Sequence, residues 1–208
     1  MKAILIANPK GGSGKTTLST NIAGYLAAQG KTVQLLDLDR QQSASFWLSN
    51  RSESLPPIRR LGENKPGTKA DWLVIDSPAG LHGKNLEHAI RLAHKIVVPV
   101  APSLFDMHAS RDFFRDLAEA KAVRKGKVSV GVVGMRMAPQ TRAAVTLEQF
   151  LADMELPVLA YLREAQVYVN AAFEGKSLFD MPPHLAEREW QQWEYLCDWL
   201  GQVEADEK

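Results

Sequence analysis

A glycine-rich segment near the N-terminus carries lysine and threonine side chains at spacings that suit phosphate binding. It reads Lys10-Gly11-Gly12-Ser13-Gly14-Lys15-Thr16-Thr17 and comes directly after an apolar run. Glycines let successive backbone N–H groups point at one anion, and the N-terminus of a following helix adds positive potential. Lys15 would reach the β- and γ-phosphates of a nucleotide, and the Thr16 hydroxyl would ligate Mg²⁺. The segment therefore predicts a phosphate-binding loop, although Pro9 stands where the common motif has its first glycine.

Carboxylates follow two further apolar runs. Asp37 and Asp39 end the run at 33–36, and alternation along an extended chain puts both on the same side. Asp76 ends the run at 72–75, where a carboxylate can hold Mg²⁺ opposite the phosphate loop. A simpler role stays open for Asp39, because an aspartate in that position can also cap a helix starting near Gln41.

The elements that must position these residues alternate along the chain. Short runs rich in Ile, Val and Leu predict strands at 3–7, 33–36, 72–75, 96–100 and 128–133, with at most a short one at 58–61. Longer amphipathic patterns predict helices at 15–29, 41–50, 86–93, 107–123, 141–154 and 165–173. Uninterrupted apolar strands suit a sheet buried on both faces. We therefore predict an α/β doubly wound fold, with a mostly parallel sheet flanked by helices.

The composition is that of one ordinary globular domain. The 208 residues carry 25 basic and 24 acidic side chains, so a nucleic-acid contact would need a local patch or an assembly. The single cysteine, Cys197, excludes an intrachain disulfide and an all-cysteine cluster built by one chain. No apolar run reaches the roughly 18–20 residues of a membrane-spanning helix. We expect residues 1–208 to form one domain, with 52–68 as an exposed connection.

The C-terminal stretch 184–201 has one apolar helical face, made of Trp190, Trp193, Leu196, Cys197 and Leu200. Two roles are open for it: a helix that docks on the core, or an amphipathic helix that lies on a membrane. A membrane helix should carry basic residues on its polar face. This one carries Glu187, Glu189, Glu194 and Asp198 against Arg188. The acidic face favours docking on the core and no membrane partner.

The loop Lys10-Gly11-Gly12-x-Gly14-Lys15-Thr16-Thr17 resembles the deviant Walker A box of the ParA/MinD superfamily of ATPases, which have the P-loop NTPase fold. The resemblance implies ATP and Mg²⁺ as ligands. It also implies that Lys10 crosses a dimer interface to the phosphates of the partner's nucleotide.

The resemblance extends from about residue 1 to 180. The Asp37-Leu38-Asp39 stretch resembles switch I, with Arg40 where the family usually has proline. It implies that Asp39 positions or activates the attacking water and that Asp37 lies near the metal. The segment from Asp76 to Gly80 resembles switch II. Met135 and Arg136 stand where relatives contact the base, and 161–180 resembles a segment that closes over the base.

The resemblance is strongest to short ParA-type partition ATPases without an N-terminal helix-turn-helix. It implies slow ATP hydrolysis, a homodimer formed on ATP binding, non-specific DNA binding on the nucleoid in the cytoplasm, and a small centromere-binding, ParB-like adaptor. The alternatives are a positioning ATPase for a protein cluster or organelle and a MinD-like membrane-cycling regulator. An iron–sulfur reductase on the same scaffold is disfavoured, because no cysteine follows Asp76 in the switch region.

Overall fold

The computed structural model describes residues 1–61 and 69–202 and contains one seven-stranded sheet. The strands are β1 (Lys2–Ile6), β2 (Val33–Asp37), β3 (Ile58–Arg60), β4 (Trp72–Asp76), β5 (Lys95–Val100), β6 (Ser129–Met137) and β7 (Val158–Arg163). Their order is β3-β2-β4-β1-β5-β6-β7, and every neighbouring pair is parallel. The predicted fold class is confirmed. Because β1 lies between β4 and β5, the strand order reverses direction there, which is where ligands of such sheets bind.

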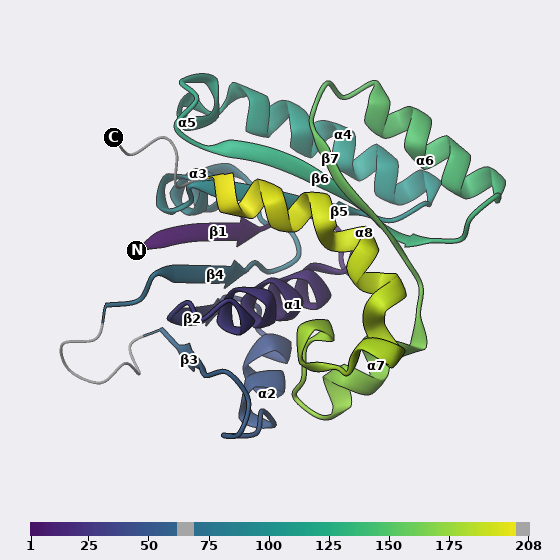
Figure 1. Cartoon of the computed structure of the whole chain (residues 1–208). Coiled ribbons are helices and arrows are strands. Elements are labelled where there is room, and N and C mark those ends of the chain that lie inside the picture. The colour runs from purple at the N-terminus through teal and green to yellow at the C-terminus, as the bar shows by residue number, and fades with distance from the viewer. Residues whose placement is uncertain (62–68, 203–208) are drawn as a thin grey trace.

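Helices cover both faces of the sheet (Figure 1). They are α1 (Lys15–Ala28), α2 (Ser43–Ser49), α3 (Gly83–Leu92), α4 (Leu104–Glu119), α5 (Lys121–Arg124), α6 (Arg142–Ala152), α7 (Gln166–Phe173) and α8 (Pro183–Gly201), with a 3₁₀ turn η1 at Leu178–Asp180. Along β1, Ile4 and Ile6 pack with α1, α2 and α8, while Ala3 and Leu5 pack with α3, α4 and α6. The alternation of the buried strand residues thus builds two separate apolar layers.

Several elements differ from the sequence prediction. The helix predicted at 107–123 is two helices, because Ala120 adopts ψ 127° and interrupts the helical backbone. Strand β6 continues beyond 133 to Met137, so Met135 and Arg136 belong to the strand instead of following it. Strand β7 is absent from the predicted strands. The short strand predicted at 58–61 within the connection 52–68 is confirmed as β3, and residues 62–68 lie outside the described part of the chain.

Helix α8 packs on the core, as its acidic polar face predicted. Trp193, Leu196 and Leu200 are fully or almost fully buried in the layer that also holds α1 and α2. One expectation about this helix was wrong: Glu189, assigned to the polar face, is only 2% exposed. Within residues 1–61 and 69–202, no helix combines the length and the apolar character needed to cross a membrane.

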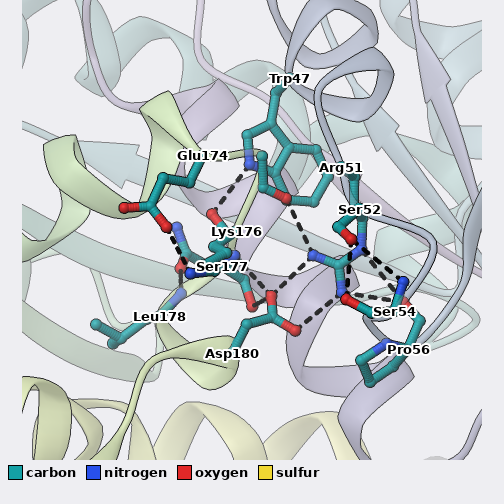
Figure 2. A network of polar contacts seen from close by, with 12 residues as sticks. Trp47, Arg51, Ser52, Ser54, Pro56, Glu174, Lys176, Ser177, Leu178 and Asp180 are labelled. Carbon is teal, nitrogen blue, oxygen red and sulfur yellow. Dashed lines mark hydrogen bonds and ion pairs between the residues drawn. The ribbon is translucent and has the colours of Figure 1, made fainter.

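A buried polar network joins the end of α2 to the segment after α7 (Figure 2). The Arg51 guanidinium pairs with the Asp180 carboxylate through two hydrogen bonds of 2.8 and 2.9 Å, and both side chains are at most 4% exposed. Arg51 also donates to the carbonyl oxygens of Pro56 and Gly175. The indole of Trp47 donates to the Lys176 carbonyl at 3.0 Å. Helix α2 is therefore tied at two points to the 174–180 segment.

The same segment is tied to α1. Asn21 on α1 accepts a hydrogen bond from the Leu178 backbone N–H at 2.6 Å. Gly24 on α1 faces Ser177 so closely that a Cβ at position 24 would lie 2.0 Å from the Ser177 hydroxyl. These contacts hold α1, α2 and η1 as one unit on one face of the sheet.

Burial works to raise the pKa of the Asp180 carboxyl, but hydrogen bonds from Arg51 and Ser177 outweigh it and the pKa is lowered. The ion pair should therefore stabilise the fold above the unfolded-state pKa of about 4 and lose its effect as the pH falls through the lower folded-state value. We expect Asp180→Asn to reduce the free energy of unfolding at pH 7 by about 3–5 kcal/mol, because it leaves a buried guanidinium unpaired. Urea denaturation measures the loss.

The matched control is Asp112→Asn, since Asp112 pairs with Arg115 on the surface with both side chains at least 60% exposed. Its effect should stay within about 0.5 kcal/mol. Equal effects of the two substitutions would contradict the assignment of Arg51 and Asp180 as a stabilising pair.

Candidate functional site

The glycine-rich loop connects β1 to α1 and is anchored at its start by a buried asparagine. The Asn8 side-chain amide donates to the Pro99 carbonyl at 2.7 Å and to the Ser110 hydroxyl at 3.0 Å. Its carbonyl oxygen accepts from the Lys10 backbone N–H at 2.8 Å. Asn8 thus fixes the loop to β5 and α4. This role could not be predicted from the sequence, in which Asn8 simply follows the apolar run at 3–7.

Two glycines of the loop have backbone conformations that other residues rarely adopt. Gly12 has φ +73° and Gly14 has φ +99°. A Cβ at Gly14 would lie 2.6 Å from the terminal methyl of Met135. Gly14 is also the residue before α1, where it supplies no side-chain cap, and the first turn of α1 has no acidic residue. The positive end of the helix is therefore presented to the loop without a competing carboxylate, as an anion site requires.

The two lysines of the loop differ in their surroundings. Lys15 is 7% exposed and donates to the Lys10 carbonyl at 2.9 Å. Burial lowers the pKa of Lys15, and the nearby carboxylates of Asp76 and Asp39 oppose that shift. Lys10 is exposed. One lysine therefore points into the loop, and the other is available to a molecule outside it.

Thr16 and Asp76 meet at the junction of α1 and β4. The Thr16 hydroxyl donates to one carboxylate oxygen of Asp76 at 2.8 Å, and the Ser19 hydroxyl donates to the other at 2.9 Å. Burial raises the pKa of Asp76 to about 6, although both hydroxyl groups favour its ionised form. Ser19 was not identified from the sequence; it lies one helical turn after Lys15, on the same side of α1.

These oxygens fit Mg²⁺. The ion prefers hard oxygen ligands and is held by one or two protein groups together with substrate phosphates and water. Thr16 and Asp76 offer a hydroxyl and a carboxylate side by side, and the cation would compensate a buried negative charge. In the part of the chain that the structure describes, no group of three or more His, Cys, Asp or Glu side chains could hold a metal without a ligand's help.

Asp37 and Asp39 have different partners. Both carboxylate oxygens of Asp37 accept backbone hydrogen bonds, from Asp39 at 3.0 Å and from Ser45 at 2.9 Å. Asp37 thereby caps the first turn of α2, the role that the sequence had left open for Asp39. The Asp39 carboxylate accepts from the Gln41 N–H at 2.9 Å and lines the cavity above the loop. Of the two, Asp39 is the one available for chemistry.

A cavity of about 470 Å³ runs from the loop to the ends of β6 and β7. Met135 and Arg136, predicted to contact a base, both line it, but they also act on the loop. Met135 is buried against Gly14, and Arg136 is exposed and donates to the Gly12 carbonyl. Arg136 has φ +50°, at an irregularity in the pairing of β6 with β7.

The far wall of this cavity comes from β7 and α7, and includes Arg163, Glu164 and Tyr168. The sequence pattern gave no reason to select these residues individually. Of the predicted residues, the structure gathers Gly11 to Thr17, Asp39, Met135 and Arg136 around one cavity, with Asp76 bonded to Thr16 behind it.

Comparison with known proteins identifies a family and similar folds. The model of the CobQ/CobB/MinD/ParA nucleotide binding domain covers residues 4–178. The maintenance of carboxysome distribution protein A of Halothiobacillus neapolitanus is 28% identical over 191 residues, which cover 86% of this chain and 87% of that protein.

Two solved structures have the same fold. The ATP complex of a McdA variant from Cyanothece superposes with a TM-score of 0.71 at 20% identity, covering 94% of this chain and 96% of that one. A chain of the MinC:MinD cell division protein complex of Aquifex aeolicus gives a TM-score of 0.73 at 21% identity, covering 97% and 96%. At these identities the likeness concerns the fold.

The raised pKa of Asp76 generates a pH prediction for the protein without nucleotide or metal. A buried carboxyl with a raised pKa contributes stability below its unfolded-state pKa of 3.8 and loses it as the pH rises through about 6. From pH 4 to pH 7, the free energy of unfolding of wild type should therefore fall by on the order of 1–3 kcal/mol relative to that of Asp76→Asn, whose side chain does not titrate. Urea denaturation across this range measures the difference.

Asp71→Asn is the matched control, because Asp71 is exposed at the other end of β4. Its stability should follow that of wild type across the range. A profile of Asp76→Asn parallel to that of wild type would show that the Asp76 carboxyl does not titrate abnormally.

Proposed function

The chain belongs to the CobQ/CobB/MinD/ParA nucleotide binding domain family, and from this premise we propose that it is a ParA-type ATPase that positions a protein-based cargo. In this proposal residues 1–208 act as one ATPase domain with α8 as part of it. ATP binding closes a homodimer, and slow hydrolysis, stimulated by an adaptor, opens it again.

The observation that carries the proposal is that one of the two loop lysines is buried and the other is exposed. Lys15 is buried in the loop, where it would bind the phosphates of the chain's own nucleotide. Lys10 is exposed only five residues away, on a loop that Asn8 holds in place. A second cation at this position suits the phosphates of a nucleotide held by a second copy.

The other residues take their roles from the surrounding geometry. The backbone from Gly11 to Thr17 would cradle the phosphates of ATP, and Thr16 with Asp76 would hold Mg²⁺. Bound Mg²⁺ supplies charge neutralisation at the phosphate oxygens. Asp39 lines the cavity and would orient the attacking water. Asp37, proposed from the sequence as a residue near the metal, would act by fixing α2 behind Asp39.

The base would lie toward the ends of β6 and β7. Met135 and Arg136 line that part of the cavity from one side, and Arg163 and Tyr168 line it from the other. Met135 and Arg136 would contact adenine from their side of the cavity. The contacts of both residues with the loop would couple the base to the phosphates.

Similarity to a carboxysome-distribution protein along most of both chains supports a protein cluster or organelle as the cargo. Partition of a plasmid or chromosome with a ParB-like, centromere-binding adaptor is the second candidate, supported by the family itself. For both candidates, the ATP-bound dimer would bind the DNA of the nucleoid without sequence specificity. A MinD-like membrane cycle is less well supported, because the apolar face of α8 is buried in the core.

We expect Lys15→Ala and Lys10→Ala to separate nucleotide binding from dimerisation. Lys15→Ala should abolish ATP binding in calorimetry, because the loop loses its internal cation. Lys10→Ala should bind ATP with nearly wild-type affinity but stay monomeric in light scattering with ATP and Mg²⁺. An intact ATP dimer of Lys10→Ala would refute the proposed role of Lys10, and tight ATP binding by Lys15→Ala would refute the loop assignment.

ATP-dependent retention on DNA of arbitrary sequence tests the proposed non-specific DNA binding. Wild type with ATP and Mg²⁺ should be retained on DNA-coated surfaces. Retention should fall steeply as salt rises from 50 to 200 mM, because protein binding releases cations condensed on the DNA and a higher salt concentration makes that release less favourable. Asp39→Ala, which would trap the ATP dimer, should dissociate more slowly on ATP removal. Retention on anionic liposomes and not on DNA would favour the membrane-cycling alternative.

A further inference from the structure

Three side chains within one turn of α8 contact residues of the cavity wall. Glu189 pairs with the Arg163 guanidinium, Gln192 accepts a hydrogen bond from the Arg163 backbone N–H at 2.9 Å, and Trp193 bonds to Tyr168. Arg163 and Tyr168 both line the cavity, whereas none of the three α8 residues does. Helix α8 therefore reaches the site through residues that line the cavity, Arg163 and Tyr168 among them.

The contact with Arg163 uses a buried carboxylate. Arg163 donates through Nε to Oε1 of Glu189 at 2.6 Å, and Nη2 of the same guanidinium also contacts this oxygen. The Glu189 side chain is 3% exposed, while the Arg163 side chain is 30% exposed at the cavity. A charge buried this deeply is unfavourable unless it is paired, so the contact between the two side chains should persist. Because two nitrogens of the guanidinium contact the same carboxylate oxygen, the contact also fixes the plane of the guanidinium. A planar cation held in one orientation is suited to stack on, or hydrogen-bond to, a flat base.

The contact with Tyr168 fixes an aromatic ring. The Trp193 indole N–H donates to the Tyr168 hydroxyl at 2.9 Å. Trp193 is fully buried, and Phe179 packs edge-to-face against it with ring centroids 5.6 Å apart. Burial raises the pKa of Tyr168 to about 12, so its hydroxyl stays protonated at neutral pH. The ring of Tyr168 is thus held at its hydroxyl end by the core while its residue lines the cavity.

The phosphate end of the cavity is held by different contacts. Asn8 anchors the loop to β5 and α4, Met135 packs against Gly14, and Asp76 bonds to Thr16. None of these contacts involves α8. The phosphate loop and the cavity wall that α8 contacts therefore have different supports.

We infer that Glu189 and Trp193 are positioning residues, which make α8 the element that sets the geometry of the base-binding wall. The inference rests on the proposed function, in which this wall receives the base of ATP. It predicts that substitutions in α8 weaken recognition of the base and leave recognition of the phosphates unchanged.

The experiment compares ATP with inorganic tripolyphosphate, which can use only the phosphate loop. Dissociation constants with Mg²⁺ are measured by calorimetry for wild type, Glu189→Gln and Trp193→Phe. We expect ATP affinity to fall about tenfold in each variant, the effect of one lost charged or buried hydrogen bond, and tripolyphosphate affinity to change less than about twofold. Glu187→Gln and Tyr195→Phe, on exposed positions of the same helix, are the matched controls and should behave as wild type.

A double-mutant cycle distinguishes loss of the hydrogen bond between Trp193 and Tyr168 from general damage to the fold. Trp193→Phe and Tyr168→Phe delete the two ends of one hydrogen bond. Tyr168→Phe removes only the hydroxyl group, whereas Trp193→Phe also removes part of a buried ring. Their effects on ATP affinity should be clearly less than additive. Thermal unfolding identifies any variant whose fold is damaged.

Each outcome distinguishes the inference from the function on which it rests. Wild type that binds neither ligand would overturn the proposed function. If wild type binds both ligands, equal losses for ATP and tripolyphosphate in the variants would show a merely structural role for α8 and overturn the inference. Unchanged ATP affinity in folded Glu189→Gln and Trp193→Phe would also overturn it.

Discussion

A buried carboxylate next to a helix N-terminus is the constraint on which the site depends. Asp76 is 1% exposed at the end of β4, and its charge is compensated by hydroxyl groups from the first turns of α1. Burying a carboxylate in this way is unfavourable unless such partners, or a cation, are close. The arrangement requires β1 and β4 to be neighbours in parallel register, because only then do Thr16 and Asp76 meet. The same adjacency places the glycine loop directly above the pair.

Around Asp76, three separate sets of side-chain contacts hold the elements that surround the cavity. Asn8 fixes the start of the phosphate loop, the Arg51–Asp180 pair fixes α2 to the 174–180 segment, and α8 holds Arg163 and Tyr168. The short loop that carries Asp39 runs between β2 and α2, so it is held at both ends by fixed elements. Asp37 strengthens that connection, because its carboxylate caps α2 from the end of β2. Motion of Asp39 is thereby confined to a few residues between rigid supports.

Family membership and local geometry support different parts of the functional picture. The match over residues 4–178 establishes a nucleotide binding domain of the ParA/MinD type. The opposite exposure of Lys10 and Lys15 supports an ATP-dependent dimer, and similarity to a carboxysome-distribution protein supports a protein-based cargo. The buried apolar face of α8 joins this helix to the core and, through Glu189 and Trp193, to the cavity wall.

The phosphate loop, the order of strands and helices, and the parallel sheet could be predicted from the sequence, because each depends on local patterns of residues near one another in the chain. Lys15, Thr16 and Asp76 could be selected for the same reason. Glu189 looked like a surface residue and Asn8 like a strand end, since their roles depend on partners 26 and 91 or more residues away. Only the tertiary structure decided that Asp37 and not Asp39 caps α2, and that α8 supports the cavity. Hydrogen bonds between distant elements form where packing brings side chains together, and the spacing of residues along the chain does not encode that proximity.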